Sequence, residues 1–481
     1  PRLSLIKTPL QRGFLFFAIF IPVFNPQTLP MIMKRIIITL IIMTAFSYSG
    51  EIDDVYQSSS EKIIQTCLNN DEGFERLAEL CDTFGPRFTG SQNLEDAIDW
   101  LLEKMEKDGL SNVHGEKVRV PRWIRGNESL ELIEPFAKDM HILGLGGSIG
   151  TPKKGIRGDV FCVNSFEDLE ANADQAKGKI VLFNVPFTTY GKTVQYRYGG
   201  ASAAAKAGAI ASLVRSIGPF SMNTPHTGGM YYEEGIKKIP HAAITLEDAK
   251  MFQRIQDRGG KVTVKLKMDG HFIPDGWSRN VIGELPGSEF PEEVVVMGGH
   301  IDSWDVGQGA MDDGGGCVAA WEALRIIKEL GLKPKRTIRV VMWTNEENGT
   351  RGGNAYRDNH MDNLKNHILA IESDGGVFSP EGFGFTGSDE ARVMVKEIAS
   401  LLEPIGSNFI GDSGGGADIG PIMNEGVPGM GLKVDGSKYF WYHHTNADAI
   451  DKLDKDEFNR CVASMAVMAF VVADLDKRLP R

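Results

Sequence analysis

The stretch GGHIDSWDVGQGAMDDGGG, residues 298–316, places one histidine and four aspartates within nineteen positions. Glycines separate these residues, and the apolar run EVVVM precedes them. Carboxylates and imidazoles without thiolates are the ligands that suit zinc or a similar divalent ion. Without a cation, acids so close together would repel one another and raise one another's pKa. The stretch therefore predicts a metal site.

Further acids and histidines follow other apolar runs in the second half of the chain. Glu346 and Glu347 follow VVMWTN, Asp374 follows ILAIES, and His443 and His444 lie in YFWYHHTNAD. Two divalent ions about 3.5 to 4 Å apart need roughly five protein ligands, with one carboxylate bridging both. Each pair alone has an ordinary explanation, such as a turn or a solvated edge. Their position after successive predicted strands favours the metal interpretation.

The elements that would position these residues alternate between β-branched runs and amphipathic helices. The runs are SRNVIGEL, EVVVMGG, GCVAAWEALRIIKELGL, TIRVVMWTN and HILAIESD. This alternation predicts an α/β fold with a mainly parallel sheet covered by helices on both faces. Ligands of such sheets bind at the carboxyl ends of the strands. We therefore expect the polar pairs to converge at one edge of the sheet.

The remainder of the chain suggests a divided domain. Residues 61–110 have helical periodicity, as in LEDAIDWLLEKMEKDGL. Residues 127–271, called the insert below, contain the β-rich runs GKIVLFNVPF, AIASLVRS, HAAITL and KVTVKLKM and a small-residue helix, GGASAAAKAGA. We predict that residues 51–126 and 272–481 form one catalytic domain, interrupted by the insert.

Composition excludes several classes of protein. With 42% hydrophobic and 24% charged residues over 481 positions, the chain is typical of a globular protein rather than a disordered or multi-span one. The net charge of −12 is dispersed and no basic stripe occurs, so we expect no nucleic acid partner. The five cysteines form no C-x-x-C pair, which argues against a disulfide scaffold and leaves open one bridge between Cys67 and Cys81.

The N-terminal region carries a targeting pattern. Residues 33–50, MKRIIITLIIMTAFSYSG, have the basic start, apolar run and small residues of a secretory signal peptide. We expect the mature protein to be extracellular or lysosomal, without a stable membrane span. Residues 1–32 are expected to precede the translation start, and the alternative is an uncleaved N-terminal anchor.

The polar motifs together resemble those of a known family. GGHIDSWDVGQGAMDDGGG, TNEENGTRGG, IESDGG and HHTNAD are similar to motifs of the M28 family of co-catalytic zinc exopeptidases, and particularly of its carboxypeptidase branch. The resemblance runs from about Glu61 to Asp474 and includes FGPRFTGS. It implies two zinc ions per subunit, a protease-associated-like domain for the insert and a homodimeric enzyme.

The resemblance also implies roles for individual residues. His300 and Asp374 would bind one zinc ion, Glu347 and His444 the other, and Asp312 both. Glu346 would be the general base that takes a proton from the attacking water. In an extended segment Glu346 and Glu347 point in opposite directions, which suits separate roles. Outside the ligand set, Asp302 would orient His300, His443 would lie behind His444, and the Asp312–Asp313 peptide would be cis.

The expected reaction is hydrolysis of unblocked dipeptides and short peptides. An aminopeptidase using the same site is an alternative, and a receptor or scaffold that has lost the metals is a second one. Candidate groups for the substrate carboxylate are Lys438, Tyr439 and His443. The segment TPHTGGMYYEEG, around His226 and Tyr231, is either part of a substrate pocket or a surface loop.

Two sequons bear on glycosylation. Asn127 begins NES at the predicted boundary of the insert and is the expected acceptor. Asn348 begins NGT directly after Glu347, so we expect this sequon to be unused.

Overall fold

The computed structural model describes residues 51–481, except the side chains of Glu51 and Asp53. The predicted signal peptide and residues 1–32 lie outside the described residues. Residues 52–481 form one compact unit. In this part of the chain, no helix combines the length and the apolar character that crossing a membrane requires.

The first sheet has the strand order β1-β10-β12-β11-β13-β16-β14-β15. Its strands are β1 (Ser111–Ile124), β10 (His271–Leu285), β11 (Phe290–His300), β12 (Arg336–Trp343), β13 (His367–Glu372), β14 (Pro380–Thr386), β15 (Phe409–Gly411) and β16 (Gly429–Val434). The central strands β12, β11, β13 and β16 run parallel. Towards the edges, β1 pairs antiparallel with β10, β10 with β12 and β14 with β16, whereas β15 runs parallel to β14. The predicted parallel sheet is confirmed at its centre, and the antiparallel edges were not expected.

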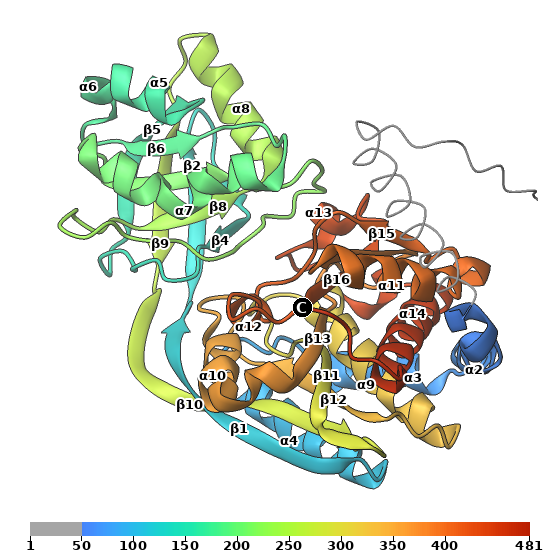
Figure 1. The fold of residues 1–481 in the computed structure, drawn as a ribbon. Helices are drawn as coiled ribbons and strands as arrows, with labels where there is room; N and C mark the ends of the chain where they lie inside the picture. Colours follow the sequence, from blue (N-terminus) through green and yellow to red (C-terminus); the bar gives the residue numbers. More distant parts are fainter. Residues whose placement is uncertain (1–50) are drawn as a thin grey trace, which may run out of the picture. The chain divides into compact units, whose positions relative to one another are not determined.

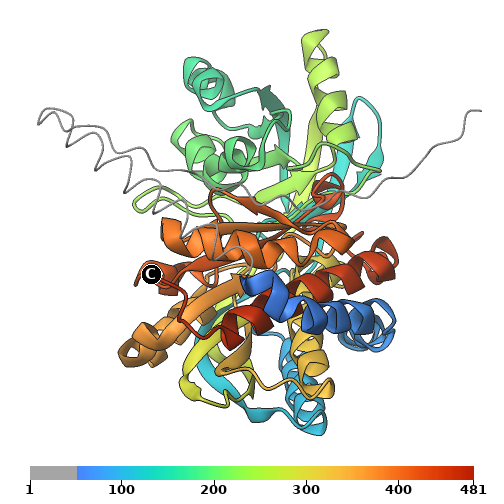
Figure 2. The same ribbon diagram turned by 45° about the vertical axis from the view of Figure 1, so that its right-hand side comes forward.

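Helices cover both faces of this sheet. They are α2 (Glu51–Leu68), α3 (Glu72–Phe84), α4 (Gln92–Lys107), α9 (Gly315–Glu329), α10 (Arg351–His360), α11 (Asp389–Ser400), α12 (Gly420–Met423), α13 (Tyr439–Tyr442) and α14 (Lys455–Asp474), with helical turns η1 (Ala310–Gly314), η2 (Met361–Asn366), η3 (Glu403–Ile405) and η4 (Ile450–Lys452). Helices α9 and α14 pack against each other and against β11 and β12 (Figure 1; Figure 2 gives the turned view).

Alternation along β11 explains how both faces are buried. Val294 and Val296 pack in one apolar cluster with Tyr356 of α10 and Ile422 of α12. Because successive side chains of a strand point to opposite faces, Val295 and Met297 face the layer of α9 and α14 instead. The predicted α/β class with helices on both faces is therefore confirmed.

The insert contains a second sheet, with the strand order β3-β2-β9-β5-β6-β7-β8-β4. Its elements are β2 (Glu128–Glu134), β3 (Lys138–Met140), β4 (Ile142–Gly144), β5 (Ile156–Val163), α5 (Phe166–Ala171), α6 (Ala173–Ala176), β6 (Ile180–Phe183), α7 (Tyr190–Lys206), β7 (Ala211–Arg215), β8 (His241–Ile244), α8 (Leu246–Asp257) and β9 (Thr263–Met268). Strands β5 to β8 run parallel, and α7 begins well before the small-residue run that predicted a helix. The insert is thus more helical than its sequence pattern suggests.

Strands β1 and β10 connect the insert to the rest of the chain. They pair antiparallel from Ser111 with Glu284 to Ile124 with His271 (Figure 1). The chain therefore enters and leaves the insert at neighbouring positions on adjacent strands.

Cys67 and Cys81 are buried and each has a free thiol. The remaining cysteines of the described chain are also free. A bridge between Cys67 and Cys81, left open by the sequence, is therefore not formed.

Candidate metal centre

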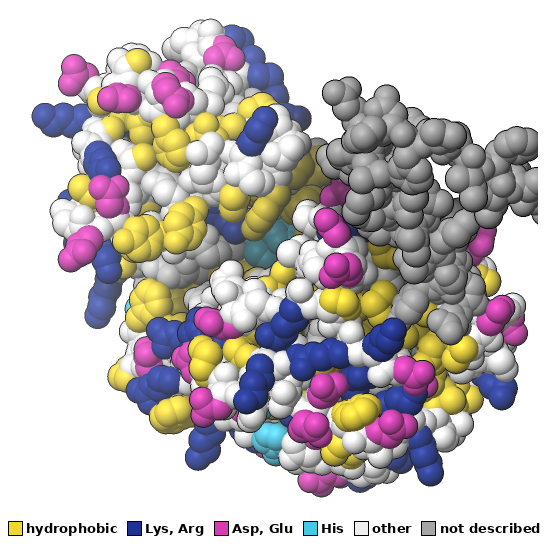
Figure 3. All heavy atoms as spheres, in the orientation of Figure 1, with side chains coloured by type: hydrophobic (Ala, Val, Ile, Leu, Met, Phe, Trp, Pro, Cys, Tyr) yellow, Lys and Arg dark blue, Asp and Glu magenta, His cyan; other side chains and the backbone are white. Residues whose placement is uncertain are grey.

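The carboxyl ends of β11, β12 and β13 bring the predicted site residues together. Several of these residues line a cavity of about 890 Å³ that also receives side chains from the insert. Residues from the main domain include Asp312, Glu346, Glu347, Asp374, Tyr439, His443 and His444. Figure 3 shows histidine side chains in the hollow between the insert and the rest of the chain. The convergence expected at one edge of the sheet is thus present.

His300 forms the first donor cluster. Its Nε2 atom lies 3.1 Å from Asp312 Oδ1 and 3.4 Å from Asp374 Oδ1. Its Nδ1–H donates to the backbone carbonyl oxygen of Asp302 at 2.8 Å. That bond fixes the tautomer in which Nε2 is left to bind a metal. The three side chains have donor atoms within 4.8 Å of one another.

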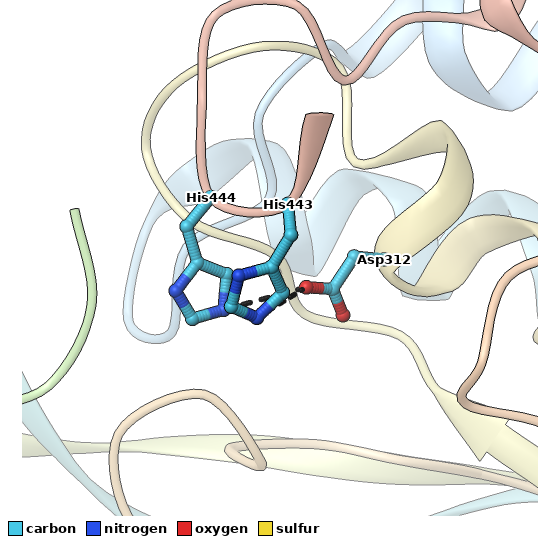
Figure 4. A group of neighbouring side chains, drawn as sticks. All are labelled: Asp312, His443 and His444. Carbon is cyan, nitrogen blue, oxygen red and sulfur yellow. Dashed lines mark ion pairs between the residues drawn. The ribbon is translucent and has the colours of Figure 1, made fainter. Parts of the chain in front are cut away.

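His444 forms the second donor cluster. Its Nε2 atom lies 3.1 Å from Glu347 Oε2 and 3.3 Å from Asp312 Oδ2. Asp312 therefore contributes one oxygen to each cluster. The adjacent His443 stacks on His444 with ring centroids 3.5 Å apart, and its Nε2 lies 3.7 Å from the same Asp312 oxygen (Figure 4). His443 is thus an alternative to Glu347 as the third donor here.

The two clusters fit divalent metal ions. Asp312 Oδ2, Glu347 Oε1 and His443 Nδ1 are buried without hydrogen-bond partners. Buried polar atoms of this kind are costly unless they bind a partner. Nitrogen and oxygen donors without thiolates match the preferences of zinc. A cation at the second cluster would give the Asp312 and Glu347 carboxylates the partner that they lack.

Glu346 and Glu347 lie in a turn after β12 rather than in an extended segment. The expected alternation of their side chains therefore does not apply. The contacts of the two glutamates distinguish their roles instead, because Glu347 pairs with His444. Both backbone amides donate to the Asp302 carboxylate, at 3.0 Å for Glu346 and 3.4 Å for Glu347.

Asp302 thus has a different contact from the one expected. Its carboxylate oxygen is 3.8 Å from His300 Nδ1, whereas its carbonyl oxygen is in direct contact with that atom. The Thr89 hydroxyl donates to the same carboxylate at 2.8 Å. The Asp302 side chain therefore holds the turn after β12, and its backbone orients the histidine.

Arg87, in the FGPRFTGS segment, is a functional residue that sequence reasoning missed. Its guanidinium is fully buried and donates to the carbonyl oxygens of Ile301 at 2.9 Å, Gln308 at 2.7 Å and Gly309 at 2.8 Å. These carbonyls belong to the loop between β11 and η1. Arg87 therefore fixes the loop that separates His300 from Asp312.

Two further acids hold the backbone around Asp312. Asp448 accepts from the amides of Met311 at 2.7 Å and Asp312 at 3.2 Å. Asp313 accepts from the amide of His300 at 3.0 Å. The Asp312–Asp313 peptide is cis, as the family resemblance predicts. Asp448, the acid that ends the HHTNAD motif, thus holds the backbone of Asp312, whose carboxylate both clusters share.

Comparison with known proteins decides the family. The sequence profile of Peptidase family M28 matches residues 280–469. Carboxypeptidase Q of Mus musculus is 49% identical over 429 residues, which cover 89% of this chain and 91% of that protein. The chain belongs to peptidase family M28. The predicted family is therefore confirmed, and the chain is a peptide hydrolase.

Solved structures agree with this assignment. A Peptidase M28 precursor from Shewanella amazonensis has a TM-score of 0.86 at 35% identity, covering 89% of this chain and 99% of that one. BSAP, a zinc aminopeptidase from Bacillus subtilis, has a TM-score of 0.64 at 20% identity, covering 85% of this chain and 98% of its own, and shares the fold.

The acids of this M28 peptidase have shifted proton affinities. Burial, with Asp374 and Glu347 adding their charge, raises the pKa of Glu346 well above its ordinary value. Burial and the Asp312 carboxylate raise the pKa of Glu347 to about 7. A carboxyl group with a raised pKa can exchange protons near neutral pH, which is what a general base requires.

The insert takes part in the site of this M28 peptidase through Thr227. Its backbone carbonyl oxygen lies 3.3 Å from His444 Nδ1, and its amide donates to the His444 carbonyl at 2.9 Å. Arg125 donates to the Thr227 hydroxyl at 3.2 Å and to both Asp305 oxygens, at 2.8 and 2.5 Å. The segment TPHTGGMYYEEG contains Thr227 but predicted a substrate pocket or a surface loop rather than this backbone contact, and no sequence pattern pointed to Arg125.

The other predicted substrate contacts divide into two groups. Tyr439 and His443 line the cavity, whereas Lys438 is exposed and not among its lining residues. In the TPHTGGMYYEEG segment, His226 is 1% exposed and does not line the cavity. Tyr231 is 51% exposed and stacks on Tyr198. This segment reaches the cavity through Gly229 and Met230 instead.

The two sequons of this M28 peptidase differ in position. Asn127 is exposed just before β2, as expected for an acceptor. Asn348 lines the cavity beside Glu347, and its side chain accepts a hydrogen bond from Asn345. A glycan on Asn348 would fill the cavity, so its predicted disuse agrees with this position.

Proposed function

We propose that this M28 peptidase is a di-zinc exopeptidase of the carboxypeptidase and dipeptidase type, acting on unblocked dipeptides and short peptides. The observation that carries the proposal is the shared carboxylate of Asp312. One of its oxygens lies with His300 and Asp374, and the other with Glu347 and His444. Two clusters joined by one carboxylate are the arrangement that a pair of metal ions needs.

Bound zinc supplies Lewis acid chemistry, polarising the scissile carbonyl and lowering the pKa of the attacking water. Glu346 accepts the proton of that water and later delivers a proton to the leaving amine. Its backbone amide is fixed by Asp302, and its raised pKa suits both transfers. Glu347 is used as a metal ligand and therefore keeps its charge.

The relatives support the proposed direction of cleavage. Carboxypeptidase Q sequences are about half identical to this chain over most of its length, which supports a carboxypeptidase. The signal-peptide pattern of residues 33–50 supports a secreted or lysosomal enzyme. A homodimer is proposed from the family resemblance, and light scattering of the purified protein measures it directly.

The test compares kcat/KM for one dipeptide in its free, N-acetylated and C-amidated forms. We expect the free dipeptide to be cleaved fastest and both blocked forms to be slowed markedly. Equal rates for the three forms would exclude recognition of the termini. If the C-amide alone were tolerated, the enzyme would be an aminopeptidase.

A further inference from the structure

Asn345, directly before the two glutamates, has a fully buried side-chain amide and a positive φ of 67°. Asparagine adopts this left-handed conformation more readily than most residues. Its Oδ1 atom accepts a hydrogen bond from the backbone amide of Arg351 at 3.4 Å. Because a backbone N–H can only donate, this contact identifies which side of the Asn345 amide is the oxygen. The Nδ2 group must therefore face the other way.

The partners of Asn345 Nδ2 agree with this orientation. It donates to the Thr89 hydroxyl oxygen at 3.3 Å and to Asn348 Oδ1. The Thr89 hydroxyl gives its own hydrogen to the Asp302 carboxylate, so its oxygen is left to accept. Each donor in this chain thus meets an acceptor, and the orientation of both asparagine amides is fixed.

Asn348 consequently presents N–H donors to the cavity of the candidate metal centre. Its side chain is partly exposed and lines that cavity, and its Oδ1 is already used by Asn345. Its Nδ2 group has no hydrogen-bond partner among the described residues. A side-chain amide carries two N–H donors, and both are available to a ligand here.

Asn348 lies where the glutamate turn approaches the insert. It directly follows Glu347, whose Oε2 atom is 3.1 Å from His444 Nε2 in the second donor cluster. A Cβ atom on Gly229 of the insert would lie 3.7 Å from the Glu347 carbonyl oxygen. Gly229 and Met230 line the same cavity. A substrate side chain that leaves the metal centre between the turn and the insert therefore meets the Asn348 amide.

We propose that Asn348 donates a hydrogen bond to the side chain of one substrate residue. It thereby favours a residue with an acceptor oxygen, in a hydroxyl, amide or carboxylate, over an apolar residue of the same shape. An apolar analogue leaves the fixed donor without a partner, which is the basis of such discrimination. Asn345 is a positioning residue, because it holds the Asn348 amide in the donating orientation. The inference rests on the proposed exopeptidase function and adds a side-chain preference to it.

The test compares threonine with valine, which have nearly the same shape, at each position of an alanine-containing dipeptide. In the zinc-loaded enzyme, Asn348→Leu should lower the threonine-to-valine ratio of kcat/KM roughly 3- to 10-fold, the value of one hydrogen bond. One donor contacts one residue, so only one of the two dipeptide positions should respond. The matched control is Asn363→Leu, an exposed change outside the cavity, which should leave the ratio unaltered at both positions.

Two further variants test the orientation of the amide. Asn348→Asp keeps an oxygen towards Asn345 and replaces the N–H donors by a carboxylate oxygen. It should therefore lower the glutamate-to-glutamine ratio of kcat/KM at the responsive position by at least about 10-fold. Asn345→Gly suits the positive φ and removes the amide, so the threonine-to-valine ratio should fall part of the way. A merely structural Asn345 would instead slow all dipeptides equally and leave that ratio unchanged.

A binding measurement separates this inference from the proposed function. Calorimetric titration uses the zinc-loaded Glu346→Gln variant, which should not turn over the peptides. This variant should bind the threonine dipeptide more tightly than the valine dipeptide, and adding Asn348→Leu should remove the difference. Unchanged ratios in Asn348→Leu, or an equal fall at both dipeptide positions, would overturn the inference. Selective binding by a wild-type enzyme that hydrolyses neither dipeptide would overturn the proposed function alone.

Discussion

The backbone of Thr227 makes a reciprocal pair of hydrogen bonds with His444. The Nδ1–H of the imidazole donates to the Thr227 carbonyl at 3.3 Å, and the Thr227 amide donates to the His444 carbonyl at 2.9 Å. Thr227 belongs to the insert, whereas His444 follows α13 near the C-terminus. Partners that fix the second nitrogen of a ligating histidine tune metal affinity. The insert therefore helps to build the metal centre that it covers.

Arg125→Met should weaken this link, because Arg125 joins Thr227 to Asp305 in an ion pair with a 2.5 Å contact. Loss of one partner of a largely buried pair should lower the free energy of unfolding by about 3 kcal/mol. Zinc affinity should fall roughly 10-fold. Urea unfolding and zinc titration against a competing chelator measure the two effects. Lys117→Met, an exposed change on β1, is the control, and unaltered zinc affinity in Arg125→Met would contradict the link.

Metal removal should abolish activity, and zinc should restore it. Asp312→Ala should bind neither ion tightly, because Asp312 contributes to both clusters. Asp374→Ala should lose one ion, because Asp374 contacts only the His300 cluster. Metal content per subunit, measured by elemental analysis, distinguishes these outcomes. Full activity in metal-free protein would exclude the metal site.

The paired glutamates should separate proton transfer from metal binding. Glu346→Gln should keep its zinc and lose roughly 10²- to 10⁴-fold in kcat, the contribution of a general base. Glu347→Gln should lose zinc affinity because it removes a partner of His444. Zinc lost from the first variant and kept in the second would reverse the assignments. If His443→Gln instead loses an ion that Glu347→Gln keeps, then His443 is the ligand.

Stability at acid pH should depend on His367. Burial, with Arg339 adding its charge, lowers the pKa of His367 to about 3, and its Nε2 lies 2.9 Å from the Tyr356 hydroxyl oxygen. The unfolded histidine has a pKa of about 6.5, so below that pH only the unfolded state takes up a proton. Stability is complete above about pH 6.5 and falls progressively towards pH 3, by about 2 kcal/mol at pH 5. Urea unfolding at pH 5 and pH 7 should show a smaller difference for His367→Gln than for the exposed control His114→Gln.

The sequence predicted the convergence of His300, Glu347 and Asp374 because apolar runs identify strands and parallel strands end at one edge. It could not predict that Asp302 orients His300 through its carbonyl oxygen, because residue type does not fix which atom makes the contact.

The contribution of the insert was unpredictable for a different reason. Thr227 acts through backbone atoms, which every residue possesses, across 217 positions of sequence. Its own motif, TPHTGGMYYEEG, suggested side chains as substrate contacts instead. The edge strands β14 and β15, which join the sheet through the antiparallel pairing of β14 with β16, were likewise not expected, because short glycine-containing strands have a weak periodic signal.

The pairing of Ile124 with His271 brings the ends of the insert to neighbouring positions on adjacent strands. A domain whose ends meet in this way can be exchanged as a cassette, because the host strands need not move apart to receive another one. Thr227, whose backbone contacts His444, belongs to this cassette, whereas His300, Asp312 and Asp374 belong to the host. A cassette grafted in its place therefore keeps the host's metal centre intact only if it restores the backbone contact with His444.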